Sequence, residues 1–232
     1  MQVSVIIPAL NEADSIQRCT AAARREHPPD AVEIIVADGG STDGTPDLLP
    51  PDVRLVRSPR GRGVQMNRGA AASHGEILVF CHADTLLPEG WRDAAIDALR
   101  RPGVSGGTFQ TLILPEEGSL ILYVRNRVVL PTNWRIMFGD QTHFMSRATF
   151  EAVGGYQEIL LMEDVEMSRA LHRVGKLVRI PLRVITSSRR FLERGALRQS
   201  LANAWSMFRY LYLNATAEDI AQTYRSSREL AP

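Results

Sequence analysis

A run of five apolar residues that ends in two polar ones constrains this chain more than any other feature. Ile77–Cys81 predicts a strand buried on both faces, as a parallel sheet with helices on both sides requires. His82 and Asp84 follow, separated only by Ala83. They point to the same side of an extended segment, at the strand end where open α/β sheets bind ligands. We therefore expect Asp84, assisted by His82, to hold a divalent cation that carries phosphates. The alternative is that Asp84 only caps the next loop and that His82 only packs against its neighbours.

Length and composition place the chain among ordinary globular proteins. Its 232 residues, 44% hydrophobic and 23% charged, suffice for one large α/β domain, or for a domain with a small annex. A net charge of +1 gives no overall field that would attract nucleic acid. Cys19 and Cys81 lie in apolar surroundings, which favours neither a disulfide framework nor a zinc site. With no leader-like segment before Val3 and no bilayer-length apolar run, we expect a cytoplasmic protein, with the inner face of the membrane as an alternative.

Strands and helices alternate through residues 1–100, which predicts βαβ units and a mostly parallel sheet. Asn11 is expected to cap a first helix that starts near Glu12. Besides Ile77–Cys81, the elements expected here are strands at Val3–Ile7, Glu33–Ala37 and Val53–Val56, a helix through Gln65, Asn67 and Ala70, and a helix at Trp91–Leu99.

Polar side chains follow three of these strands. Asn11 and Glu12 come after the first, Asp38 after the second, and His82 with Asp84 after the fourth. Because parallel strands end at the same edge of a sheet, these groups should gather there. Carboxylates, backbone amides and arginines at one edge suit a nucleotide pocket. The chain has no Gly-x-Gly-x-x-Gly after its first strand and no Gly-Lys-Ser/Thr loop, which disfavours a dinucleotide dehydrogenase and a P-loop ATPase.

The second half is expected to continue with mixed strands and helices. Trp91 is expected to pack in the core rather than to form a sugar platform. Ser146 should cap a helix through Phe150 and Val153. The remaining expected elements are strands at Gly106–Leu114, His143–Met145, Lys176–Ile180 and Val184–Thr186, and helices at Ser119–Leu130, from about Glu163 to Val174, and after Thr216.

A stripe of apolar residues marks the helix expected at Ala196–Leu213. Such a stripe is most often core or a subunit interface, so a homodimer is one expectation. Because arginines lie nearby, contact with an anionic membrane is the second. The residues concerned are Leu197, Leu201, Ala204, Trp205, Phe208, Leu211 and Tyr212, with Arg194, Arg198 and Arg209 beside them.

Several ordered motifs resemble those of family 2 glycosyltransferases with the GT-A fold, over roughly the first three quarters of the chain. They are Val5–Glu12, Val36–Asp43, His82–Asp84, Gly154–Tyr156 and Met162–Glu166. The family usually carries Asp-x-Asp where this chain has His-Ala-Asp, which suggests a bacterial subgroup with that variant. Because the last Asp is retained, the resemblance implies a Mg²⁺ or Mn²⁺ ion at Asp84, with His82 beside it.

The resemblance also implies roles for other residues. Asp164 is expected to be the catalytic base, and Glu163 is expected next to it at the acceptor or the donor sugar. The structural alternative is that both acids only interact favourably with the helix dipole, as acids in a first helical turn do. Asp140 and Gln141 are expected at the acceptor. The alternative is a self-bonded turn, in which a side chain of the turn forms a hydrogen bond with the backbone of the same turn. Apart from the resemblance, the paired Arg189 and Arg190 follow a strand end, so Arg189 is expected on the diphosphate, or else on a solvated surface. The expected donor-binding set is Pro8, Ala9, Asn11, Glu12, Asp38, Arg62, Asn67, Ala83 and Arg189.

These observations together predict an α/β protein with a GT-A-like, mostly parallel central sheet flanked by helices. Residues 1–190 would form the glycosyltransferase domain, with a donor half at 1–100 and an acceptor half at 101–190, and residues 191–232 a helical extension. The expected reaction moves one sugar from a UDP- or GDP-sugar to the hydroxyl of a small-molecule or lipid-linked acceptor, with inversion. A polymerising enzyme is disfavoured because the family's Gln-x-x-Arg-Trp motif is absent. A nucleotidyltransferase and a non-catalytic nucleotide-sugar-binding protein are the alternatives.

Overall fold

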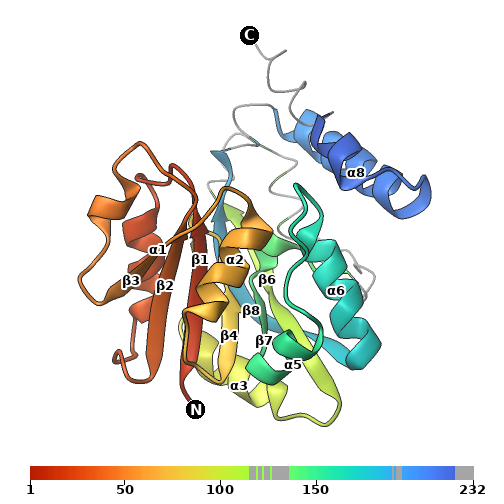
Figure 1. Cartoon of the computed structure of the whole chain (residues 1–232). Helices are drawn as coiled ribbons and strands as arrows, with labels where there is room; N and C mark the ends of the chain where they lie inside the picture. The colour runs from red at the N-terminus through yellow and green to blue at the C-terminus, as the bar shows by residue number, and fades with distance from the viewer. Residues whose placement is uncertain are drawn as a thin grey trace.

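An eight-stranded sheet organises the part of the chain that the structure describes (Figure 1). The computed structural model describes residues 1–114, 119, 122, 126, 136–189, 191 and 195–222. The strand order across the sheet is β3-β2-β1-β4-β7-β6-β8-β5. The strands are β1 (Val3–Ala9), β2 (Val32–Asp38), β3 (Val53–Arg57), β4 (Ile77–Phe80), β5 (Thr85–Leu86), β6 (Val104–Leu114), β7 (His143–Ser146) and β8 (Lys176–Ser187).

The first four strands of this order form the parallel half that the sequence predicts. β1 pairs in parallel with both β2 and β4, and β2 pairs in parallel with β3. Ala9 lies opposite Asp38, and Ile6 lies opposite Phe80. The segments after β1, β2 and β4 therefore leave the sheet at the same edge, as expected.

The other half of the sheet is mixed. β7 is antiparallel to both β4 and β6, while β6 and β8 run parallel. β8 is one continuous strand, so the expectation of two strands interrupted at Pro181 is wrong. The register with β6 shifts between Phe109 and Gln110, whose partners are Ile180 and Arg183. Proline is tolerated at such an irregularity, because a residue there need not donate to the ladder.

Helices cover both faces of the sheet and create two apolar cores. The helices α1 (Ile16–Arg24) and α3 (Trp91–Leu99) pack on one face, against Val5 and Val79 among others. On the other face, α2 (Arg62–Ala71), α5 (Arg147–Ala152) and α6 (Glu163–Val174) pack against neighbouring residues such as Ile6 and Leu78. Because consecutive strand residues point to opposite faces, the central strands are apolar throughout. Trp91 is 1% exposed, so it belongs to the core as expected.

Most helix boundaries agree with the expectations, but the first one does not. α1 begins at Ile16, and its N-terminal cap position is Ser15. Asn11 instead has a positive φ of 56°, and its side-chain oxygen accepts a hydrogen bond from the Thr42 backbone. Most of the expected helix at Ser119–Leu130 and the side chains of Arg190 and Arg194 lie outside the described residues. Two short 3₁₀ turns, η1 (Thr45–Leu48) and η2 (Gly139–Gln141), complete the main elements.

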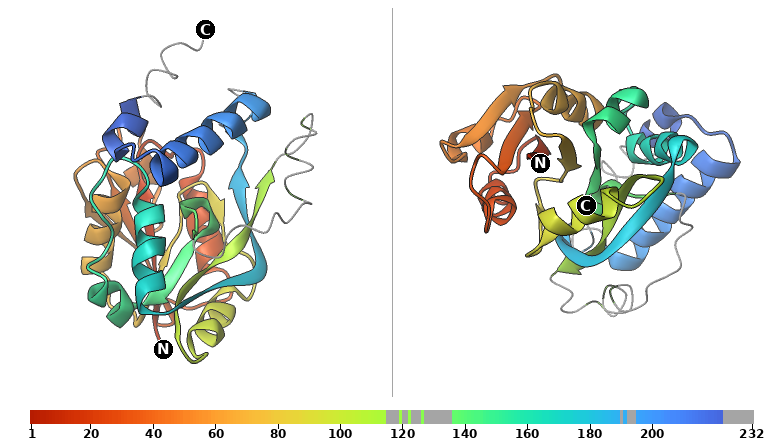
Figure 2. Two further views of the ribbon diagram at one scale, coloured as in Figure 1. Left: turned by 90° about the vertical axis from the view of Figure 1, so that its right-hand side faces the viewer. Right: turned by 90° about the horizontal axis from the view of Figure 1, so that it is seen from below.

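The C-terminal helix α8 (Ala196–Tyr212) lies beyond the edge of the sheet where β1, β2 and β4 end (Figure 1). Figure 2 shows it crossing the same end of the molecule, next to the start of α6. Thr216 caps the helical residues that follow it, because its hydroxyl accepts a hydrogen bond from the Asp219 backbone. No helix in the described part of the chain has both the length and the apolar character needed to cross a bilayer.

Candidate active site

Asp38 is the structural centre of the first polar cluster. It ends β2 and has no exposed surface. Its carboxylate accepts backbone hydrogen bonds from Gly40 and Ser41, and it forms an ion pair with Arg57 at 2.6 Å. Burial alone would raise the pKa of Asp38, but the hydrogen bonds from Ser41 and Gly40 and the Arg57 guanidinium lower it below its usual value. The carboxylate is therefore charged and rigidly oriented at the sheet edge.

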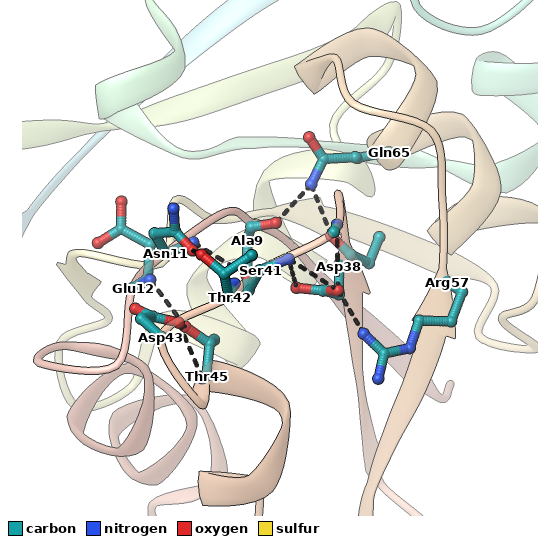
Figure 3. A network of polar contacts seen from close by, with 12 residues as sticks. Ala9, Asn11, Glu12, Asp38, Ser41, Thr42, Asp43, Thr45, Arg57 and Gln65 are labelled. Atoms are coloured by element: carbon teal, nitrogen blue, oxygen red, sulfur yellow. Dashed lines mark hydrogen bonds and ion pairs between the residues drawn. The ribbon is translucent and has the colours of Figure 1, made fainter.

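The loops after β1 and β2 hold each other through side-chain contacts (Figure 3). The Asn11 backbone donates to Ser41 Oγ, and the Glu12 backbone donates to Thr45 Oγ1 at 2.8 Å. In the reverse direction, Thr42 N–H donates to Asn11 Oδ1 at 2.8 Å. Asn11 thus acts as a clamp between two loops, which explains why it is not a helix cap.

Gln65 is a structural residue of this edge to which the sequence analysis assigned no function. It lies on α2 and is 3% exposed. Its side-chain nitrogen lies 2.7 Å from both the Ala9 and Ala37 carbonyl oxygens (Figure 3). One amide therefore joins the ends of β1 and β2 to α2. Its position two residues before Asn67 and inside a predicted helix gave no sign of this role.

A second cluster forms between the ends of β1 and β4. Burial raises the pKa of Glu12; Ser15 and Arg189 oppose this effect, whereas the nearby Asp84 carboxylate adds to it. The Ser15 hydroxyl donates to Glu12 Oε2 at 3.0 Å, and Arg189 Nη2 lies 3.4 Å from the same oxygen. Glu12, Asp84 and Arg189, which are distant in sequence, are therefore neighbours. They combine two acids with one guanidinium at the predicted phosphate position.

Asp164 lies close to the motif that ends β4. The backbone N–H of Gly139 donates to Asp164 Oδ2 at 2.8 Å, and the N–H of Val165 donates to Oδ1 at 2.8 Å. A Cβ added to Gly139 would lie 2.8 Å from His82 Nε2 and 3.6 Å from Asp164 Oδ2. The imidazole of His82 and the carboxylate of Asp164 therefore flank Gly139. Ser168 fixes this arrangement, because its hydroxyl accepts from the Met137 backbone at 2.9 Å.

Glu163, the neighbour of Asp164, is buried and paired. It is 2% exposed, and its Oε1 lies 2.7 Å from Arg62 Nε. Burial raises the pKa of Glu163; Arg62 opposes this effect, whereas Asp164 adds to it. Glu163 Oε2 has no hydrogen-bond partner among the residues that the structure describes. Arg62 and Glu163 thus link α2 to the start of α6. Met162, just before them, has a positive φ of 72°, a conformation that non-glycine residues adopt mostly at constrained sites.

Three predicted site residues have other partners in the described structure. Asn67 exchanges two hydrogen bonds of 2.9 Å with the Tyr156 backbone, so it fastens α2 to the segment before α6. Gln141 Oε1 accepts from the Phe138 backbone at 3.2 Å, which is the self-bonded turn that we gave as the alternative. Burial lowers the pKa of Arg179, and the nearby Asp140 carboxylate opposes this effect. Their ligand contacts stay predictions, as do those of the buried Pro8, Ala9 and Ala83.

Comparison with known proteins places this arrangement in a family. The model of the family described as Glycosyl transferase family 2 matches residues 4–155, which is more than half of the chain. The glycosyltransferase AglE of Haloferax volcanii is 27% identical, over 90% of this chain and 81% of that protein. The beta-monoglucosyldiacylglycerol synthase of Synechocystis sp. is 26% identical, over 78% of this chain but only 43% of that protein.

Solved structures show the same fold. The mannosyltransferase PcManGT from Pyrobaculum calidifontis, solved in complex with GDP-Man and Mn²⁺, is 26% identical with a TM-score of 0.60. The alignment covers 79% of this chain and 56% of that one, so the chain spans little more than half of that protein. S. aureus TarS in complex with UDP-GlcNAc has a TM-score of 0.62 at 17% identity, which supports the fold alone. With its GT-A-like fold and this family match, the chain belongs to glycosyl transferase family 2.

Proposed function

We propose that the protein transfers a single sugar from a UDP- or GDP-sugar to an acceptor hydroxyl, with inversion at the anomeric carbon and with Mg²⁺ or Mn²⁺ as cofactor. Residues 1–100 would bind the donor, residues 101–190 would bind the acceptor, and residues 191–232 would form an extension. Family membership supports a transferase, and the GDP-Man and Mn²⁺ bound to PcManGT support the class of donor and the cation.

The position of Gly139 is the observation that carries this proposal. Its backbone holds Asp164, while its missing side chain leaves room for His82. A carboxylate from the second half of the chain is therefore fixed beside the strand end of the first half. A base next to a predicted donor site is what the transfer of a sugar to a hydroxyl requires.

The groups after β4 fit a divalent cation that the donor helps to bind. Burial raises the pKa of Glu12 and repulsion by the Asp84 carboxylate adds to this effect, and a cation would relieve the repulsion. Among the described residues, no set of three or more His, Cys, Asp and Glu side chains could hold a metal. Because Mg²⁺ often takes one or two carboxylates and completes its shell with phosphate oxygens, Asp84 would hold the ion together with the diphosphate. The ion would supply positive charge against the leaving diphosphate.

Asp164 would accept the proton of the acceptor hydroxyl. Its two backbone hydrogen bonds orient the carboxylate, and each oxygen retains a second lone pair for the acceptor. The acceptor oxygen would attack the anomeric carbon opposite the leaving group, through an oxocarbenium-like transition state. One base and one direct displacement lead to inversion.

Arg189 is placed to help the leaving group. Its guanidinium lies next to Glu12, and its side chain is 43% exposed. A planar guanidinium can donate two parallel hydrogen bonds to a diphosphate. Arg62 is paired with Glu163, the neighbour of Asp164 in the chain, which suggests a position beside the donor sugar.

A nucleotide-release assay with an Asp164→Asn variant tests the proposal. The wild-type chain is incubated with UDP- and GDP-sugars, Mn²⁺ and a panel of acceptor alcohols, and free nucleoside diphosphate is measured. We expect release with at least one donor, and a loss of 100-fold or more in kcat for Asp164→Asn, because the general base is removed. The affinity for the nucleoside diphosphate should change less than threefold.

The same assay separates the alternatives. Full turnover by Asp164→Asn would show that this carboxylate is not the base. Binding of a nucleotide sugar without release in the presence of any acceptor would favour a non-catalytic binding protein. For an active donor, NMR of the product determines whether the anomeric configuration inverts.

A further inference from the structure

The helix α8 is fixed to the body of the protein by its polar side. Tyr210 donates a hydrogen bond to Glu166 Oε1 at 2.9 Å, and the Arg169 guanidinium lies 5.6 Å from the centre of the Tyr210 ring. Burial and the Glu166 carboxylate raise the pKa of Tyr210 to about 12, so the phenol keeps its proton. Gln199, which lies on the same side of α8, is 3% exposed. These contacts define which face of α8 points inward.

The opposite face of α8 is apolar and uncovered. At about 100° per residue, the exposed large apolar residues of α8 fall within one stripe of about 100°, centred roughly opposite Gln199 and Tyr210. The Trp205 and Phe208 rings stack at 5.8 Å, and Phe208 lies 5.4 Å from Tyr212. We call this set the α8 stripe: Leu197 (58% exposed), Leu201 (62%), Trp205 (55%), Phe208 (45%) and Tyr212 (70%).

An apolar face of this size on a helix requires an explanation. A surface helix normally turns its apolar stripe toward the core and its polar residues toward water. α8 does the reverse, since its inward side carries Gln199 and Tyr210. Contiguous exposed apolar patches generally mark contact sites for another surface. The core alternative from the sequence analysis is therefore excluded for the α8 stripe.

The charges of α8 indicate which surface it fits. The helix contains Arg198 and Arg209 and no Asp or Glu. Both arginines lie along the same flank of the α8 stripe, at about 100° per residue. In a symmetric contact with a second copy, the same patch would face itself, so Arg198 would meet a positively charged helix that has no acid of its own to compensate. Arg209 lies near the Asp219 carboxylate, so Arg198 carries this argument. A surface of anionic lipids satisfies both the apolar stripe and the arginine flank.

We propose that α8 binds the surface of an anionic membrane, with the α8 stripe in the interfacial layer. Trp205 and Tyr212 are well suited to this layer, because each joins an apolar ring to a polar N–H or O–H group, and Phe208 adds apolar area. The helix would lie flat, since its stripe runs along its whole length. This interaction is independent of the sugar transfer that we propose.

The location of α8 links this surface to the candidate active site. Glu166, the partner of Tyr210, lies one turn or less from Asp164 on α6. Figure 2 shows α8 across the end of the molecule at which β1, β2 and β4 stop. Binding through α8 would therefore bring the candidate base close to the lipid surface.

Vesicle flotation with the full chain tests the proposal. The two vesicle types are pure phosphatidylcholine and a mixture of phosphatidylcholine with phosphatidylglycerol. The test variant is Trp205→Ser/Phe208→Ser, and the control is Val174→Ser. Val174 is 56% exposed but lies at the far end of α6. A second variant, Arg198→Glu, changes only the charge of the flank. Because all these side chains are exposed, the variants should keep the wild-type circular dichroism spectrum and Tm.

We expect the wild type to float with the anionic vesicles at least tenfold more than with the neutral ones, and less as salt is raised. Trp205→Ser/Phe208→Ser should lose at least tenfold of this binding, Arg198→Glu should lose severalfold, and Val174→Ser should match the wild type. Absence of binding to anionic vesicles, or binding that survives the double substitution, would overturn the proposal. A dimer that forms without lipid and is lost in the double variant, with no flotation of the wild type, would identify an interface between copies instead.

Discussion

At the scale of single residues, Asp38 shows how charge stabilises the edge of the sheet at which the candidate active site lies. Its lowered folded-state pKa means that its contribution to stability is fully present above the unfolded value of about 3.8. This contribution is lost as the pH falls below that value and through the folded-state pKa. The carboxylate is buried, whereas the Arg57 side chain is 65% exposed, so removal of the charge leaves no buried cation behind.

We expect Asp38→Asn to lower the free energy of unfolding at pH 7 by about 2 kcal/mol, because charge-assisted hydrogen bonds become neutral ones. The difference from wild type should shrink as the pH falls below about 3.8 and through the lowered folded-state pKa. Urea denaturation over this range measures it. Asp47→Asn, at an exposed carboxylate of η1, is the control and should change stability by less than about 0.5 kcal/mol. A difference that stays constant with pH would contradict the account.

Gln65 leads to a second prediction at this scale. Gln65→Leu removes the donor shared by the Ala9 and Ala37 carbonyls. Ala9 retains a hydrogen bond from the Gly39 backbone, so the expected loss is moderate, about 1–2 kcal/mol. Urea denaturation at pH 7 measures it. Gln17→Leu on the exposed side of α1 should have little effect. If Gln65→Leu and Gln17→Leu changed the free energy of unfolding equally, the link that Gln65 makes between the strand ends would contribute nothing to stability.

At the scale of elements, the sequence predicted most strands but not how distant segments meet. Apolar runs such as Ile34–Ala37 and Ile77–Cys81 indicate strands because both of their faces must be buried. Long-range contacts leave no local signal: nothing in the sequence near Asn11 shows that it accepts from Thr42. The continuity of β8 through Pro181 was missed for the same reason, since the register shift depends on its partner β6.

The turn η2 provides a prediction at the scale of elements. Gly139→Ala would place a Cβ 2.8 Å from His82 Nε2, closer than side chains tolerate, so His82 must move. Misplacement of about 1 Å can cost up to 100-fold in rate. We expect kcat for sugar transfer to fall at least tenfold, with a smaller effect on the affinity for the donor.

A double-substitution cycle identifies the cause of this loss. If Gly139→Ala acts by displacing His82, it should cost little further activity in a His82→Ala background. Steady-state kinetics on the two single variants and the double variant measure the coupling. Strictly additive losses would show that Gly139 acts on Asp164 independently of His82.

At the scale of the whole molecule, the parallel half and the mixed half contribute different groups to one edge. β1, β2 and β4 bring Glu12, Asp38 and Asp84 there, and α6 brings Asp164. The sequence predicted the first three from strand ends, because parallel pairing fixes where they meet. The position of Asp164 was expected only by resemblance. Its closeness to His82 depends on Gly139, and the exposure of the α8 stripe depends on which side of α8 packs against α6.

The central claim is that this edge binds the diphosphate of an activated sugar together with a divalent ion at Asp84. Isothermal titration of UDP and GDP into wild-type protein and Asp84→Asn, each with Mn²⁺ and with EDTA, tests it most directly. We predict at least tenfold tighter binding of one nucleotide to the wild type with Mn²⁺ than with EDTA, and equal weak binding by Asp84→Asn in both buffers. Affinity that does not respond to Mn²⁺ in the wild type, or a full response in Asp84→Asn, would contradict the claim.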